Sequence, residues 1–196
     1  AMYAAGAAAG KASARRLISA MAMYKGHGFA VGAGNNTRNN ELGDTSPPPA
    51  TLGALVDIGP GTLSGQYTTV KDDNPTDMTS IGAALSANAA TAPVAGLVQN
   101  AFTQGFRQDA RLFQIGYRLV TGVHTVTVAY NNMNERRPVD ADRYSYGVAY
   151  TYALSKRTDL SAVLTHLENK NTSQDLPGGN GFLGGVAATP GKDANS

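Results

Sequence analysis

The chain of 196 residues contains 23 Gly and 9 Tyr, no Cys and no Trp, and 15% charged residues with a formal net charge of +2. The lack of cysteine excludes disulfide scaffolds and thiolate metal sites, and a small, scattered positive charge does not indicate a nucleic-acid partner. The mean hydropathy of −0.23, without any apolar run near the ~18 residues of a membrane helix, excludes a helical membrane protein but not membrane strands of alternating hydropathy.

Segments with a period of two, typical of strands with two different faces, follow one another along the chain. We expect strands at residues 15–25, 28–36, 50–58, 62–71, 110–120, 123–133, 143–154 and 158–168. Most of these segments have about the 9–11 residues that a tilted strand needs to cross a bilayer.

Short and long connections alternate between these segments. The short ones read "KGHG", "GPG", "TGV" and "SKRT", and glycine supplies the positive φ that tight turns require. The long ones are polar and cover 37–49, 72–109 and 134–142, followed by a polar tail from 169. We expect the Ala-rich part of 72–109 to form a short helix on the rim of a barrel. Tight turns at one end and long loops at the other are typical of an antiparallel outer-membrane β-barrel, so the fold class is all-β.

One face of most of these strands is apolar and aromatic. In 143–154 the tyrosines alternate with Ser, Gly, Ala and Thr, and many rings elsewhere lie near strand ends, where amphipathic rings favour a membrane interface. We expect these side chains to face lipid or a neighbouring subunit: Tyr24, Phe29, Tyr67, Phe113, Tyr117, Tyr130, Tyr144, Tyr146, Tyr150 and Tyr152.

The opposite face is small or polar, and we expect it to line water. The predicted pore-lining residues are Gln114, Arg118, Thr125, Thr127, Ser145, Gly147, Thr151 and Arg15. The same alternation points Met21 and Met23 inward, which is unusual for such a wall. Arg118 has two interpretations: a cation in the lumen that favours anions, or a strand-end arginine paired with a turn carboxylate.

Several of these segments resemble one family. The hairpin "GVAYTYALSKRTDL" (147–160), together with "FQIGYRL", "FAVGAG" and "IGPGTLSGQYT", is similar to the general trimeric porins of Gram-negative β-proteobacteria. The resemblance implies a 16-stranded antiparallel barrel in the outer membrane, assembled as a homotrimer among lipid and lipopolysaccharide. Such a barrel passes ions and small hydrophilic solutes by passive diffusion.

The resemblance also implies that residues 1–196 are one partial barrel domain covering about strands 8 to 15 of that barrel. The chain opens on "AMYAAGAAAG" and stops on "GKDANS". We therefore expect the first half of the barrel, with its inward-folding loop, and the final strand to be missing.

A channel is one of several functions that such strands could serve. A small structural or adhesive barrel of the OmpA type, with a packed interior and no open channel, is the main alternative, and a soluble β-sandwich is a weaker one. A phospholipase-type enzyme needs Ser and His on neighbouring strands, and Ser145 and His166 are the residues of that kind. No motif supports this chemistry, so we expect no enzyme. We also expect no cofactor, no metal and no nucleic-acid partner.

Overall fold

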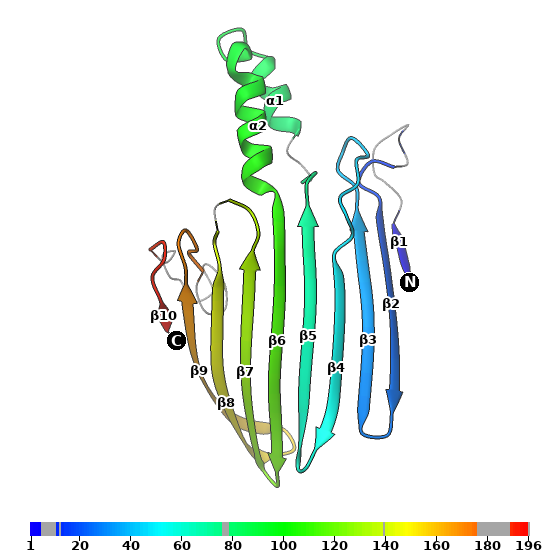
Figure 1. The fold of residues 1–196 in the computed structure, drawn as a ribbon, viewed down its shortest axis with the longest axis vertical. Helices are drawn as coiled ribbons and strands as arrows, with labels where there is room; N and C mark the ends of the chain where they lie inside the picture. The colour runs from blue at the N-terminus through cyan, green and yellow to red at the C-terminus, as the bar shows by residue number, and fades with distance from the viewer. Residues whose placement is uncertain (5–10, 12, 76–78, 139, 176–188, 196) are drawn as a thin grey trace. The chain divides into compact units, whose positions relative to one another are not determined.

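The computed structural model describes residues 1–4, 11, 13–75, 79–138, 140–175 and 189–195. Its strands form one sheet in the order of the chain, β1 to β10, and the registers of β6 to β9 are antiparallel (Figure 1). The strands are β1 Met2–Ala4, β2 Leu17–Gly26, β3 Phe29–Arg38, β4 Ala50–Ile58, β5 Gly61–Asp72, β6 Gln108–Thr121, β7 His124–Glu135, β8 Arg143–Ser155, β9 Thr158–Asn169 and β10 Ala194–Asn195.

Strands β2 to β9 begin and end within two residues of the eight ranges expected from the alternation of side chains. The short strands β1 and β10 were not expected. β1 pairs with β2 through Met2 opposite Ser19, and β10 pairs with β9 through Ala194 opposite Leu167. Two or three residues carry too little alternation to be recognised as strands without their partners.

Two-residue turns join β2 to β3, β4 to β5, β6 to β7 and β8 to β9. Gly28, Gly59 and Gly122 occupy three of these turns with φ of 72°, 60° and 59°. A side chain is strained in this left-handed region, so glycine suits these turns. In the fourth turn, the Arg157 amide donates to Ser155 Oγ over 3.1 Å.

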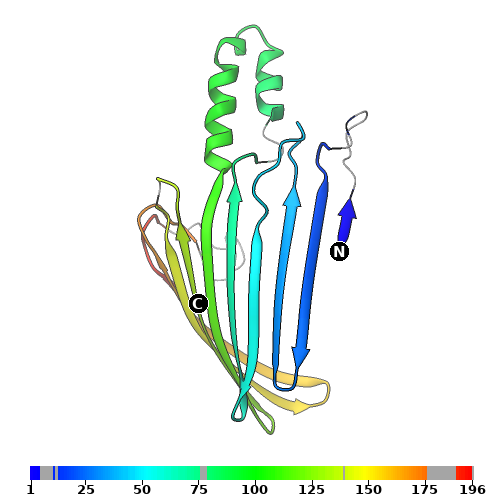
Figure 2. The same cartoon turned by 45° about the vertical axis from the view of Figure 1, so that its right-hand side comes forward.

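The long connection between β5 and β6 holds two helices, α1 (Thr79–Ser86) and α2 (Ala95–Phe106), with the short 3-10 helix η1 (Ala92–Val94) between them. Figures 1 and 2 both show α1 and α2 side by side. Their contact includes the Gly82 amide, which donates to Gln99 Oε1 over 2.6 Å. The sequence predicted only one short helix here. No helix in the described part of the chain is long and apolar enough to span a membrane.

The described residues fall into two compact units, and each is described by itself. One contains Ala1–Met21, Gly34–Ala50 and Val70–Asp109, and the other contains Ala22–Ala33, Thr51–Thr69 and Ala110–Ser196. Among described residues, the buried apolar side chains are four alanines, whereas many large apolar side chains, Leu164 and Met21 among them, are exposed. A soluble domain would bury such side chains in a core, so this sheet is not folded as one.

Candidate pore-lining face

The register of β6 to β9 assigns every side chain of these strands to one of two faces. Gly116 pairs with Ala129, Ala129 with Gly147, and Gly147 with Thr165. Directly paired residues in an antiparallel sheet point to the same side, and their neighbours along the strand point to the other. We call the side of Gly116 and Gly147 the polar face and the opposite side the aromatic face.

Seven of the predicted pore-lining residues share the polar face. They are Gln114, Arg118, Thr125, Thr127, Ser145, Gly147 and Thr151. Thr125 is paired with Thr151, whose hydroxyl lies 2.9 Å from Ser161 Oγ on the next strand. Asn131 Nδ2 donates to Ser145 Oγ over 3.3 Å. The face therefore offers hydroxyl and amide groups that can replace part of a solute's hydration shell.

Arg15, which the sequence placed at the start of a strand, is not in a strand. It lies in a turn before β2, has a φ of 60°, and donates its backbone amide to the Asn40 carbonyl oxygen over 2.9 Å. Strand alternation therefore gives no reason to point its side chain into a lumen. Hydrogen bonds to Asn39 and Asn40 stabilise this left-handed turn. The sequence around Arg15 does not reveal these contacts.

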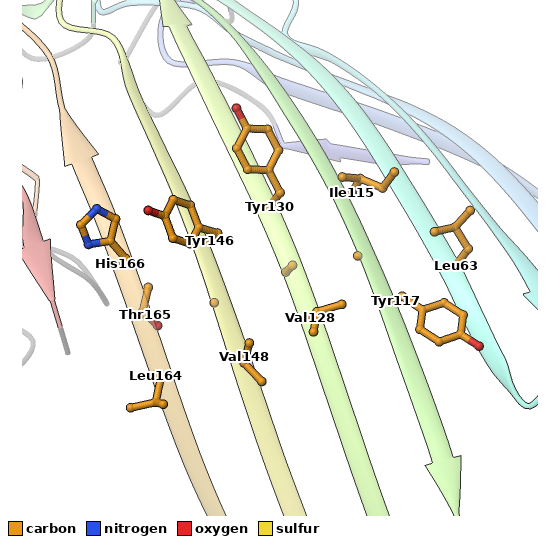
Figure 3. A pocket seen from close by; sticks show the side chains of 13 residues that line it. Leu63, Ile115, Tyr117, Val128, Tyr130, Tyr146, Val148, Leu164, Thr165 and His166 are labelled. Carbon is orange, nitrogen blue, oxygen red and sulfur yellow. The ribbon is translucent and has the colours of Figure 1, made fainter.

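The predicted aromatic residues of β6 to β8 share the other face. They are Phe113, Tyr117, Tyr130, Tyr144, Tyr146, Tyr150 and Tyr152. Figure 3 shows Tyr130, Tyr146 and His166 in one row across neighbouring strands, and the Tyr146 and His166 ring centroids are 5.0 Å apart. Near the turns, His124 Nδ1 lies 2.8 Å from the Tyr150 hydroxyl. His124 and His166 extend the aromatic face, and the alternation of side chains along β7 and β9 could have predicted this position.

The remaining predicted aromatic residues lie on β2, β3 and β5. Tyr24 and Phe29 contact each other near the β2–β3 turn, with ring centroids 5.8 Å apart. A Cβ at Gly61 would lie 2.5 Å from the Tyr117 hydroxyl oxygen, so Gly61 and Tyr67, which is six positions further along β5, belong to the aromatic face. Met21 and Met23 share the side of Gly34 and Gly32, as alternation indicated.

Strand β5 continues the polar face beside β6. Ser64 Oγ donates to the Gly116 carbonyl oxygen over 3.2 Å, and Thr62 Oγ1 donates to Asp57 Oδ1 over 2.8 Å. Arg118 is paired with Thr127, near the turn end of the face. Within the described residues, no carboxylate forms an ion pair with Arg118. Its side chain is exposed.

A groove of about 280 Å³ crosses the polar face toward its loop end. The side chains that reach it from the polar face are Gln66, Leu112, Gln114, Asn131, Met133, Arg143, Ser145 and Leu167. Arg143 forms an ion pair with Asp175, and the two side chains are 32% and 31% exposed. Alternation along single strands does not predict this groove, since the groove depends on strand register and on a residue of the tail.

Polar contacts tie the loop ends of β7 to β9 together. The Glu135 amide donates to Asp142 Oδ1 over 2.7 Å, and Arg137 Nε donates to Glu135 Oε1 over 2.8 Å. The carboxylate of Glu135 raises the pKa of the Arg137 guanidinium, so Arg137 stays charged. Asn169 is 2% exposed and accepts from Ser173 Oγ over 2.7 Å. These bonds fix the start of the tail that carries Asp175.

Ser145 and His166 do not form a catalytic pair. Ser145 is paired with Leu167, the neighbour of His166, so the two side chains point to opposite faces of the sheet. Among the described residues, no three His, Asp or Glu side chains gather as a metal site.

Comparisons with known proteins point to one family. A family model described as "Gram-negative porin" matches residues 1–172. A solved structure, the "Anion-selective porin from Comamonas acidovorans", is similar with a TM-score of 0.67 and 21% sequence identity, over 97% of this chain and 50% of that one. The chain thus spans about half the length of that porin, and an identity of 21% shows a shared fold. A search of curated proteins found no match.

Proposed function

Since the chain belongs to the Gram-negative porin family, we propose that its polar face lines a water-filled channel for passive diffusion of ions and small hydrophilic solutes. The family locates the chain in the outer membrane, as part of an antiparallel β-barrel. The observation that supports the channel most is the separation of side chains across β6 to β9. Hydroxyl, amide and small side chains share one face, and tyrosines share the other.

The aromatic face supports an orientation toward lipid or a second subunit. Its large apolar side chains, such as Tyr146 and Val148, are 48% and 47% exposed. Contact with hydrocarbon or with another protein removes this apolar surface from water. Each Å² that is removed stabilises the assembly by about 25 cal/mol. Tyr and His rings at both ends of the strands match the aromatic girdles of membrane barrels.

We propose a preference for anions, supported by Arg118 and by the neighbour. The similar porin is described as anion-selective. In this chain, Arg118 adds a cation to the polar face, and the guanidinium of Arg143 is neutralised by Asp175. A fixed cation beside a water-filled path raises the local concentration of anions.

We also propose a homotrimer, embedded in outer-membrane lipid and lipopolysaccharide. This assembly is supported by the family resemblance and by the exposed aromatic face, which offers each subunit an apolar surface for its neighbours. Chemical crosslinking of the native outer membrane should give a ladder that ends at three subunits. A ladder that ends at one subunit would contradict the trimer and leave the channel proposal intact.

Planar-bilayer recording tests the channel. The porin that carries these residues should produce stepwise, ohmic conductance increases, grouped in threes if the trimer inserts as a unit. A closed barrel of the OmpA type would fold and insert into the bilayer but give no such steps. That second result would reject the channel.

A further inference from the structure

Three apolar side chains interrupt the polar face beside an ion pair. Leu112 of β6 is paired with Met133 of β7, and Leu167 of β9 is paired with Ser145 of β8. All three line the 280 Å³ groove that also contains Arg143. Leu112 is 36% exposed, so on a water-filled wall its apolar surface is open to a solute.

The ion pair at the loop end of the groove carries both signs of charge. Arg143 Nη1 contacts Asp175 Oδ2, and that oxygen also accepts from Ser173 Oγ over 3.3 Å. A guanidinium has five N–H donors, so Arg143 keeps donors for a second carboxylate. Asp175 keeps a second oxygen, which an ammonium group can approach because about a third of the side chain is exposed.

Uncharged hydrogen-bonding groups continue the groove below the ion pair. Gln114 is paired with Asn131, and Asn131 with Ser145, which places two amides and a hydroxyl in one row. The groove has a volume of about 280 Å³, well above the ~10–15 Å³ that a single water needs. A small solute with one short side chain fits that space.

We propose that this groove is a binding subsite for zwitterionic α-amino acids with an aliphatic side chain. The carboxylate binds the free donors of Arg143, the ammonium binds Asp175, and the side chain covers Leu112, Met133 and Leu167. The proposal rests on the proposed function, because the groove must face channel water to meet a solute. A ligand with only one charge leaves the other member of the Arg143–Asp175 pair without a new partner, so it binds more weakly.

The test compares leucine with three analogues that each lack one feature. These are 4-methylpentanoate, without the ammonium; 3-methylbutylamine, without the carboxylate; and glycine, without the aliphatic chain. Each is titrated against the conductance of the porin in planar bilayers, and leucine binding is measured separately by saturation-transfer NMR on the detergent-solubilised porin. We expect leucine to block saturably. The two singly charged analogues should need about ten-fold higher concentration, as loss of one charged hydrogen bond implies, and glycine should also need a higher concentration because it buries no aliphatic side chain.

Two variants and one control locate the subsite. Arg143→Gln should weaken the leucine block about ten-fold, and Leu112→Asn should weaken leucine but leave glycine unchanged. Arg136→Gln, which removes a cation from the neighbouring loop, should leave the leucine block as in the unaltered porin. If Arg143→Gln does not fold, the analogue series on the unaltered protein still decides the question.

The outcomes separate the two proposals. Normal conductance with equal potency for leucine and its analogues overturns the subsite and leaves the channel standing. Absence of conductance from correctly folded porin overturns the channel, and the subsite with it. A leucine block that is equally weakened by Arg136→Gln would show a general charge effect and would also overturn the subsite.

Discussion

The Tyr117 hydroxyl donates a hydrogen bond over 3.0 Å to the carbonyl oxygen of Ile58, the last residue of β4. This bond links the turn end of β6 to the β4–β5 hairpin. A phenol on an outward face can thus serve a structural purpose in addition to its place at a membrane interface. We expect Tyr117→Phe to lower the free energy of unfolding by about 0.5–1.5 kcal/mol, at the low end because the bond is exposed.

Urea unfolding of the porin in detergent or liposomes measures that change. Tyr146→Phe is a suitable control, since Tyr146 contacts the His166 ring through its own ring rather than through its hydroxyl. Equal stability of Tyr117→Phe and the unaltered protein would show that water replaces the bond to Ile58 without loss.

Gly61 opens β5 in a space that admits no side chain. A Cβ there would lie 2.5 Å from both the Arg118 carbonyl oxygen and the Tyr117 hydroxyl oxygen. We expect Gly61→Ala to lower the free energy of unfolding by about 1–3 kcal/mol, the usual cost of forcing an extra methyl group into packed structure. Gly65→Ala on the same strand is the matched control, because its nearest neighbour, the Gln114 carbonyl oxygen, is 3.8 Å away. Similar losses for both variants would contradict this steric explanation.

Gly122 is required for a different reason. Its φ is 59°, and nothing lies within 4 Å of an added Cβ. We expect Gly122→Ala to cost about 1–2 kcal/mol through backbone strain alone. Gly122→Asn should lose less, since asparagine tolerates this left-handed conformation. The fraction of folded porin during refolding, followed by heat-modifiable gel migration, distinguishes these variants, and identical yields for Ala and Asn would refute the backbone explanation.

Arg118 predicts a change in ion selectivity. We expect Arg118→Glu to shift the reversal potential in a salt gradient toward lower anion preference, because the polar face then gains a fixed negative charge. Arg118→Gln should give an intermediate shift, and high salt should reduce both shifts through screening. Unchanged reversal potentials at low salt would show that Arg118 does not face the conducting path.

The sequence predicted the positions of the strands better than the contacts between different segments of the chain. Alternation with a period of two located β2 to β9, because exposed sheet faces in contact with two different solvents leave that pattern in each strand separately. It also assigned Gln114 and Tyr117 to opposite faces, and likewise Ser145 and Tyr146, since side chains an odd number of positions apart along a strand point to opposite faces. The assignment of these faces to water and to lipid stays a prediction.

Arg15 shows where the same reasoning stops. Its place next to a strand pattern suggested alternation, but the Asn40 carbonyl oxygen holds it in a left-handed turn. The pair of helices was missed for the same reason. The hydrogen bond from the Gly82 amide of α1 to Gln99 of α2 joins residues that are not neighbours in the sequence. A local pattern does not report contacts made by another segment of the chain.

The sequence alone was enough to predict β2 to β9, three tight turns with glycine and the two faces of the strands, because each depends on neighbours within a few residues. The tertiary structure decided the register, and with it the groove that places Leu112 beside Met133. It also brought Asp175 of the tail to Arg143 at the start of β8. Those relationships join residues far apart in the chain, and only backbone pairing across strands and the hydrogen bonds of the loop ends bring them together.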